Sequence, residues 1–301
     1  MKRTAHVTAP WRLRSQTVEL GTRTLVMGVV NITPDSFSDG FFPASDQAVA
    51  HALRLLDEGA DLLDLGAEST RPGSRAGGSD AAVSAEEEQA RLMPVLKEIL
   101  KARPDAVISV DTYKAATARS ALVAGAEIIN DVSGFTWDPA LAAACAEFGA
   151  GVVLMHTRGK PDEWRKQPRL APEPLLAMVR EGLAASLEAA RNAGIAEEQV
   201  AIDPGYGFGK RLDENYALLA RQAELLALGR PLVAGLSRKS FLGDTLAEFH
   251  GGAPAPVDAR ETASVAALTA AILNGASIVR VHEVRPAVEA ARIADAVVRA
   301  G

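Results

Sequence analysis

Short apolar runs recur along the chain, and each leads through a loop into a segment with helical periodicity. The runs are rich in Val, Ile and Leu, and they are apolar at consecutive rather than alternating positions. This pattern is typical of strands buried on both faces of a parallel sheet. The eight runs are TLVMGVVN (24–31), DLLDLGAE (61–68), AVISVDT (106–112), AEIINDVSG (126–134), GVVLMHT (151–157), QVAIDPG (199–205), PLVAGLSRKS (231–240) and SIVRVHEV (277–284).

The segments between these runs carry apolar residues at helical spacing. In 84–101, Ser84 and Glu87 form a candidate capping box, and Pro94 predicts a kink. In 45–60 the apolar residues recur at i, i+3, i+4, i+7 and i+11, namely Val49, Ala52, Leu53, Leu56 and Ala60. Further helices are expected over 113–124, 139–148, 173–193, 213–228, 258–274 and 286–299.

Eight strand–helix units in 301 residues favour an α/β fold of the (β/α)8 TIM barrel type. A doubly wound open sheet is the alternative, and periodicity does not exclude it. Residues 11–24 precede the first strand and read as a short N-terminal β-hairpin that closes the barrel bottom. The Gly/Ser-rich stretch 71–84 predicts a long loop. No linker divides the chain, so we expect one domain over 1–301, with the barrel proper at about 25–299.

Composition and charge narrow the class of protein. Hydrophobic residues make up 48% of the chain, which is ample for a core. The formal net charge of -6 argues against a nucleic-acid partner. The one cysteine, Cys145, excludes an intramolecular disulfide, fits a reducing compartment and reads as a small buried hydrophobe. We find no signal-peptide pattern and no apolar stretch long enough for a membrane span, so we expect a soluble, cytoplasmic protein.

Polar residues gather at the ends of the apolar runs, where such barrels have their active sites. Each has a structural alternative: Asp111 or Ser237 could cap a helix, Asp131 could stabilise a turn, and His156 could be a core histidine with its hydrogen bonds satisfied. Taken together, eight strand ends converge on one rim. In chain order they carry Asn31; Glu68, Thr70 and Arg71; Asp111; Asn130 and Asp131; Met155 and His156; Asp203; Ser237, Arg238 and Lys239; Arg280 and His282.

One group of these residues suits a flat heterocycle. Asp111, Asn130 and Asp203 offer acceptors, and a carboxylate can accept two parallel hydrogen bonds from a ring N–H and an exocyclic amine. Lys239 adds a donor for a carbonyl or a ring nitrogen. The motif GYGFGK (205–210) lacks the spacing of a dinucleotide-binding fingerprint.

A second group suits a diphosphate. Arg71, Arg280 and His282 are cationic or polar donors, and guanidinium groups match phosphate oxygens. Asn31 could give an oxygen to Mg2+, which takes few protein ligands and keeps substrate phosphates and waters. The spacing of His156 and His282 is unlike that of structural zinc motifs.

The motifs also resemble those of the dihydropteroate synthase family, and the resemblance spans residues 25–299. It rests on MGVVNITPDSFSDG, DLGAESTRPGS, SVDT, INDVSG, MH, DPGYGFGK, GLSRKSF and RVHEV. The resemblance implies a (β/α)8 barrel that condenses 4-aminobenzoate with 7,8-dihydropterin-6-ylmethyl diphosphate. Diphosphate leaves first, and the amine then attacks a pterin cation. Family members are commonly homodimers.

The resemblance also implies roles for individual residues. The pterin diphosphate is expected to contact Thr70, Asp111, Asn130, Met155, Asp203, Phe208, Lys239, Arg280, Val281 and His282. The 4-aminobenzoate is expected to contact Phe37, Thr70, Pro72 and Ser237. The metal ligand is Asn31, for Mg2+, and the catalytic residues are Asp35, Arg71 and Lys239. The loop ITPDSFSDG (32–40) would fold over the cation and exclude water.

The chain departs from the family pattern in a few places, and two rival functions follow from its pterin motifs. Phe41 and Phe42 follow the first loop, and Thr157 and Arg158 stand where many members have Met-Gln.

One rival function is that of a pterin-dependent methyltransferase, whose methyl donor has no diphosphate to bind. The other is a pterin-binding barrel that has lost its second substrate.

Overall fold

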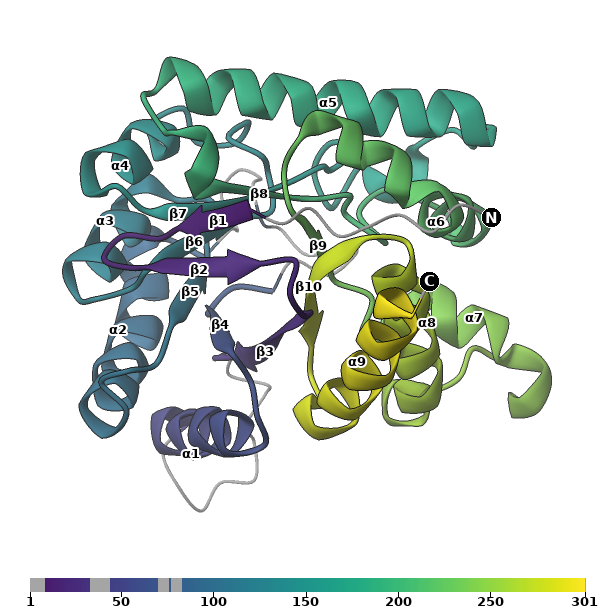
Figure 1. Ribbon diagram of the computed structural model, residues 1–301, viewed down its shortest axis with the longest axis horizontal. Coiled ribbons are helices and arrows are strands. Elements are labelled where there is room, and N and C mark those ends of the chain that lie inside the picture. Colours follow the sequence, from purple (N-terminus) through teal and green to yellow (C-terminus); the bar gives the residue numbers. More distant parts are fainter. Residues whose placement is uncertain (1–8, 33–43, 70–75, 77–82, 301) are drawn as a thin grey trace.

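Eight parallel strands close into a barrel, and helices surround it (Figure 1). The computed structural model describes residues 9–32, 44–69, 76 and 83–300. The barrel strands follow one another in chain order and the last pairs with the first, which confirms the (β/α)8 fold and excludes the open sheet. They are β3 (Leu25–Asn31), β4 (Leu62–Gly66), β5 (Ile108–Asp111), β6 (Ile128–Asp131), β7 (Gly151–Met155), β8 (Val200–Asp203), β9 (Leu232–Ala234) and β10 (Ala276–Val281).

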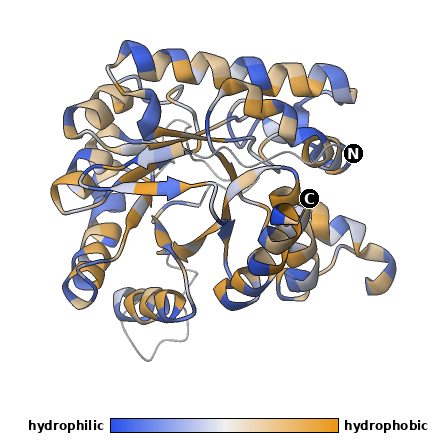
Figure 2. Cartoon of the chain, in the orientation of Figure 1, coloured by the Kyte–Doolittle hydropathy of each residue, from blue (hydrophilic) through white to orange (hydrophobic). Residues whose placement is uncertain are grey.

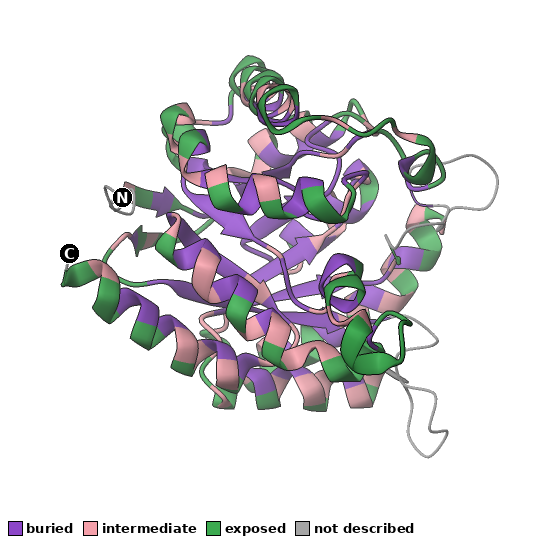
Figure 3. Ribbon diagram, turned by 90° about the vertical axis from the view of Figure 1, so that its right-hand side faces the viewer, coloured by how far each residue is buried: buried purple, intermediate pink, exposed green. Residues whose placement is uncertain are grey.

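The barrel strands bury both faces, as their continuous apolar runs predict. Val30 and Leu65 are register partners in β3 and β4, and both pack in an outer apolar layer with the helices. Met27 and Leu62, also register partners, pack in a separate inner cluster. Figure 3 shows the strands as buried and the outer helix faces as exposed. The hydropathy colouring of Figure 2 shows apolar and polar residues side by side along the surrounding helices.

The helices lie where the helical periodicity predicts them. Ser84 caps α2, because its Oγ accepts a hydrogen bond from the backbone N–H of Glu87 at 3.1 Å. The helix is continuous across Pro94. None of the helices described here is long and apolar enough to cross a membrane. The α-helices are α1 (Ala44–Asp57), α2 (Ala85–Ala102), α3 (Ala115–Val123), α4 (Leu141–Phe148), α5 (Pro172–Asn192), α6 (Leu212–Arg221), α7 (Ser240–Thr245), α8 (Glu261–Leu273) and α9 (Val284–Arg299).

The N-terminal hairpin closes the end of the barrel where the strands begin. Its strands β1 (Ala9–Arg12) and β2 (Thr17–Leu20) pair antiparallel. Trp11 and Leu20 are almost fully buried and pack in the inner cluster that the first strand residues of the barrel form. The Trp11 indole N–H donates to the backbone oxygen of Gln199 at 3.0 Å. The expected role of the hairpin is therefore confirmed.

Short 3-10 helices account for the main differences from the expected elements. The predicted helix over 213–228 divides at Arg221, where α6 continues as the 3-10 helix η4. Gln222 begins this tighter segment, and its fully buried side chain bonds to Tyr206 and to the backbone of Ala271. The 3-10 helices are η2 (Trp164–Lys166), η3 (Glu197–Gln199), η4 (Gln222–Leu228), η5 (Ala247–His250) and η6 (Val257–Arg260).

Candidate active site

Polar side chains line the inside of the barrel where the strands end. Successive strand residues point to opposite faces. Ile129 and Ile202 belong to the outer apolar layer, so the residues that follow them, Asn130 and Asp203, face inward. Met155, at the end of β7, belongs to a separate apolar cluster at this end of the barrel. The structure thus brings the expected heterocycle-binding residues to one inner layer.

Asp64 connects this layer, and sequence reasoning did not single it out. It is fully buried in the middle of β4. One carboxylate oxygen accepts from Arg280 Nε at 2.6 Å and from Asn130 Nδ2 at 3.0 Å. The other accepts from the Ser109 hydroxyl at 2.6 Å. Asp64 therefore orients side chains from three other strands. The signal in the sequence is a charged residue inside an apolar strand, where burial requires partners.

Arg280 joins two carboxylates at the centre of the site. Besides Asp64, it donates from Nη2 to Asp111 Oδ2 at 2.9 Å. Arg280, expected among the diphosphate residues, thus also joins the group around Asp111, and it shares an Asp64 oxygen with Asn130. Burial raises the pKa of Asp111 to about 7, although the Arg280 charge opposes the shift. Its carboxyl group therefore titrates near neutral pH.

The part of the inner layer across the barrel from Asp64 and Asp111 consists of Asp203, Phe208 and Lys239. The Asp203 Oδ1 accepts from the backbone N–H of Gly205 at 2.7 Å, and burial raises the pKa of Asp203. The Lys239 ammonium lies 3.9 Å from the centre of the Phe208 ring, which is a cation–π contact. Burial and then the Arg280 charge lower the pKa of Lys239 to about 8. Lys239 therefore stays mostly protonated at pH 7.

Three polar residues lie at the ends of neighbouring strands: Ser237 follows β9, His282 follows β10, and Asn31 ends β3. The Ser237 Oγ accepts from the backbone N–H of His282 at 3.2 Å and lies 3.0 Å from His282 Nδ1. Ser237 does not cap α7, which begins at Ser240 with Lys239 as its N-cap residue. Asn31 ends β3, which pairs with β10.

Val281 does not join the inner polar layer through its side chain. Val281 is buried in the outer apolar layer, so its side chain faces the helices and only its main chain can take part in the site. Its position follows from strand alternation, since Arg280 before it points inward. The expected residues that lie outside the described part of the chain are Asp35, Phe37, Thr70, Arg71 and Pro72.

The structural alternative is confirmed for Asp131 and only in part for His156, which is buried but not fully hydrogen-bonded. Asp131 accepts from the backbone N–H groups of Ser133 at 2.8 Å and Phe135 at 2.5 Å, which confirms its role in a turn. His156 is buried, and burial lowers its pKa to about 2, so its imidazole is neutral. Its Nδ1 has no hydrogen-bond partner among the described residues.

Known proteins are similar to this chain in sequence and in fold. Residues 27–282 match the family model described as pterin binding enzyme. A dihydropteroate synthase of Mycobacterium leprae is 44% identical over 92% of this chain and 94% of its own. A Xanthomonas albilineans dihydropteroate synthase structure with 4-aminobenzoic acid has a TM-score of 0.85 at 40% identity, over 96% of this chain and 98% of that one. A Burkholderia cenocepacia dihydropteroate synthase structure with 7,8-dihydropteroate has a TM-score of 0.81 at 40% identity, over 97% and 98%.

The matched region contains the whole inner polar layer, from Asp64 on β4 to Arg280 on β10. The sequence motifs and the closed barrel agree with the similarity to these proteins. The chain therefore belongs to the dihydropteroate synthase family of pterin-binding enzymes.

Proposed function

We propose that the chain condenses 4-aminobenzoate with 7,8-dihydropterin-6-ylmethyl diphosphate, releasing diphosphate and forming 7,8-dihydropteroate in folate synthesis. It is then a transferase of the pterinylmethyl group. The observation that carries the proposal is the inner polar layer around Asp64, Asp111, Asn130, Asp203 and Arg280. Structures of relatives bound to 4-aminobenzoic acid and to 7,8-dihydropteroate support the two substrate classes.

The inner layer fits the hydrogen-bonding edge of a pterin ring. Asp111 and Asp203 are carboxyl groups able to accept from a ring N–H and an amine. Asn130 donates its amide to Asp64 and keeps its amide oxygen as an acceptor. Lys239 supplies a donor for the ring carbonyl. The pterin ring would have two apolar neighbours, Phe208 and Met155. The Lys239 ammonium lies over the face of the Phe208 ring.

The diphosphate would lie toward β10 and β3. Arg280 uses Nε and Nη2 on the two carboxylates, and no described residue accepts from its Nη1. That remaining donor edge suits a phosphate oxygen. His282 lies on the same strand end, beside Ser237. We expect Arg71 to complete this group.

We infer that Mg2+ acts with the diphosphate at Asn31. A side-chain amide oxygen at a strand end is a ligand of the kind that Mg2+ accepts, with waters and substrate phosphates filling its other positions. When bound, the ion would neutralise charge on the leaving diphosphate. Asn31 would hold the substrate's phosphates at the end of the barrel that carries Arg280 and His282.

The reaction breaks the C–O bond between the pterin methylene and the diphosphate. The amine of 4-aminobenzoate forms the new C–N bond and loses a proton. Such a step needs no covalent nucleophile, and Cys145 is a poor candidate, because burial raises its pKa well above its usual range. We assign Lys239, Asp35 and Arg71 to catalysis. The proposed contacts of 4-aminobenzoate are Phe37, Thr70, Pro72 and Ser237.

The domain organisation, cellular location, oligomeric state and partners of the enzyme are also proposals. We propose a single-domain protein over 1–301 that works in the cytoplasm as a homodimer, with small-molecule substrates and no nucleic-acid partner. The Mycobacterium leprae and Xanthomonas albilineans synthases match it over 94% and 98% of their own length, which supports a single catalytic unit.

The direct test measures diphosphate release from the pterin diphosphate with Mg2+, with and without 4-aminobenzoate. We expect release that rises with 4-aminobenzoate, yields dihydropteroate and stops when EDTA removes the metal. The variant Asp203→Asn should lower kcat/KM by at least about tenfold, since it replaces a charged acceptor. Asp213→Asn, a change at an exposed carboxylate, is the matched control and should leave kcat/KM unchanged.

Two outcomes would contradict the proposal. Tight pterin binding without release would indicate a pterin-binding module. Methyl transfer from methyltetrahydrofolate to a corrinoid protein, without dihydropteroate formation, would indicate the methyltransferase.

A further inference from the structure

Two loops on neighbouring strands pack together as one unit beside the candidate active site. The loop 156–171 follows β7, and the loop 204–211 follows β8. A Cβ atom on Gly205 would lie 1.9 Å from a backbone oxygen of the first loop, and one on Gly209 would lie 2.6 Å from Cβ of Arg158. Both glycines also have positive φ angles, of 71° and 72°. Only glycine allows this close approach of two backbones.

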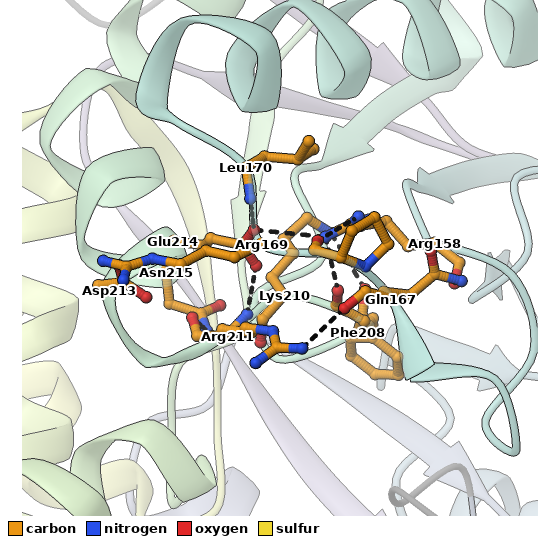
Figure 4. A network of polar contacts seen from close by, with 12 residues as sticks. Arg158, Gln167, Arg169, Leu170, Phe208, Lys210, Arg211, Asp213, Glu214 and Asn215 are labelled. Atoms are coloured by element: carbon orange, nitrogen blue, oxygen red, sulfur yellow. Dashed lines mark hydrogen bonds and ion pairs between the residues drawn. The ribbon is translucent and has the colours of Figure 1, made fainter. Parts of the chain in front are cut away.

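Arg158 lies at the centre of the contact between the loops (Figure 4). Only 5% of its side chain is exposed. Its guanidinium donates to the backbone oxygen of Pro168 at 2.8 Å and to that of Gly209 at 3.3 Å. It also lies 3.4 Å from a carboxylate oxygen of Glu214, in the first turn of α6. One side chain thus joins both loops to the helix that follows.

The packing of the two loops depends on the negative charge of Glu214, which pairs with Arg158. Its side chain is 1% exposed, and its carboxylate accepts from the backbone N–H groups of Leu170 at 2.7 Å and Arg211 at 2.6 Å. Arg158 is the cation that pairs with it. A buried carboxylate that loses its counter-ion is more costly than a lost neutral hydrogen bond. Removing the charge of Arg158 should therefore shift both loops.

The two joined loops fix the position of Phe208, whose aromatic ring forms one wall of the proposed pterin site. The backbone oxygen of Phe208 accepts from the backbone N–H of Arg158 and from Lys210 Nζ, both at 3.4 Å. The Trp164 ring packs edge-to-face on the Phe208 ring, with centroids 5.0 Å apart. The Lys239 ammonium also contacts the face of the Phe208 ring. A shift of the loops would therefore move an aromatic wall and a charged donor together.

We propose that Arg158 is a positioning residue for pterin recognition. Its ion pair with Glu214 fixes the two loops and, through them, the Phe208 ring and the Lys239 ammonium. The proposal rests on the proposed function, because it names the pterin as the ligand. Since the wall belongs to the pterin site, losing the pair weakens pterin binding and leaves the binding of 4-aminobenzoate unchanged.

The test compares Arg158→Gln with Arg169→Gln. Glutamine keeps a hydrogen-bonding side chain but removes the charge. Arg169 is an exposed arginine of the same network, paired with Asp213, and serves as the matched control (Figure 4). We expect Arg158→Gln to raise the KM for the pterin diphosphate by about tenfold, a size typical of a small misplacement of a binding group. The KM for 4-aminobenzoate and both constants of Arg169→Gln should stay within about twofold of wild type.

A second pair of variants tests the charge dependence. Arg158→Gln combined with Glu214→Gln removes the unpaired buried carboxylate and should recover part of the pterin affinity. Arg158→Lys keeps the charge but loses the planar fork, so its pterin KM should be intermediate. If Arg158→Gln does not fold, Arg158→Lys and the double variant carry the test. A wild-type pterin KM in either folded single variant, or an equal rise in both KM values, would overturn the proposal.

Direct binding separates this proposal from the proposed function. The dissociation constant for 7,8-dihydropteroate, measured by calorimetry, needs no turnover. If wild type binds this ligand but makes no product, the proposed function fails, and the comparison of Arg158→Gln with Arg169→Gln still decides the role of Arg158. Equal dissociation constants for these two variants would contradict that role alone.

Discussion

At the scale of single residues, the site depends on Arg280, whose guanidinium N–H groups donate to two different carboxylates. It bonds to Asp64 and to Asp111, which come from two different strands. Asp111 titrates near neutral pH because it is buried, and Arg280 opposes that shift only in part. The residue proposed to bind the amine edge of the pterin is therefore sensitive to pH in the range where the enzyme would work.

The pH dependence of pterin binding tests this reading of Asp111. Below a pKa of about 7 the carboxyl group is protonated and loses its capacity to accept two parallel hydrogen bonds. Affinity should therefore fall as pH falls through 7, by about tenfold for each pH unit, and level off above it. The ligand is 6-hydroxymethyl-7,8-dihydropterin, which has no titrating phosphate. Asp111→Asn should bind weakly at every pH, and a pH-independent wild type would contradict the argument.

Much of the candidate site is visible in the sequence at this scale. Asp111, Asn130 and Asp203 lie at the ends of apolar runs, and Lys239 follows another run. The structure brings all four close to Asp64 and Arg280. Asp64 was missed because it lies inside the apolar run 61–68, where the sequence does not show whether a side chain points into or out of the barrel. A strand buried on both faces lacks the alternation that would separate inner from outer positions.

At the scale of elements, Asp64 connects β4 to the other strands that carry the site. Its partners Ser109, Asn130 and Arg280 lie on β5, β6 and β10. These side-chain bonds cross the barrel interior and add to the backbone pairing between neighbouring strands. They explain how residues far apart in the chain keep a common geometry.

Replacing Asp64 tests this cross-strand role. Asp64→Asn preserves the shape but removes the charge that Arg280 pairs with, so we expect a loss of about 3 kcal/mol in the free energy of unfolding. The pterin KM should rise by at least about tenfold, since Arg280 and Asn130 lose their common anchor. Chemical denaturation and steady-state kinetics measure the two effects.

Ser109→Ala is the control for Asp64→Asn. It removes one neutral donor from the same carboxylate and should cost about 1 kcal/mol, with little change in pterin KM. Equal kinetic effects in the two variants would mean that the Asp64 charge has no particular role.

The apolar stripe predicted for α1 lies on its core-facing side but misses the centre of that face. Of the predicted stripe, Ala52 is fully buried, whereas Val49 and Leu56 are half-buried and pack against the edge of the core. The side chains that are fully buried in this helix are Ala48, Ala52 and Leu55. In an alanine-rich helix the apolar stripe is broad, so periodicity indicates a face without indicating its centre.

At the scale of the whole molecule, the hairpin completes the barrel core. Trp11 fills the end opposite the candidate site and bonds to the residue that precedes β8. Residues 11 and 199 are 188 positions apart in the chain. The hairpin thus contributes to a core formed by strands from the entire sequence.

Truncating Trp11 should destabilise the fold without altering the chemistry. Trp11→Ala removes a buried aromatic ring and its hydrogen bond, and we expect a loss of about 4 kcal/mol in the free energy of unfolding. Thermal unfolding measures this loss, and kcat/KM at low temperature should stay near wild type because the site is at the other end. Trp11→Phe, which keeps most of the ring, should cost less. A large drop in kcat/KM for the folded variant would contradict the separation of the two ends.

The sequence by itself determined the order of strands and helices, the family and most of the polar residues at the strand ends. These features depend on local apolar runs and contiguous motifs. The tertiary structure alone decided barrel closure, the inward direction of Asp64, the outward direction of Val281 and the pairing of Arg280 with two carboxylates. It also decided the joining of the two loops through Arg158. Arg280 and Asp64 are 216 positions apart, and no local pattern encodes which buried charges meet across a closed barrel.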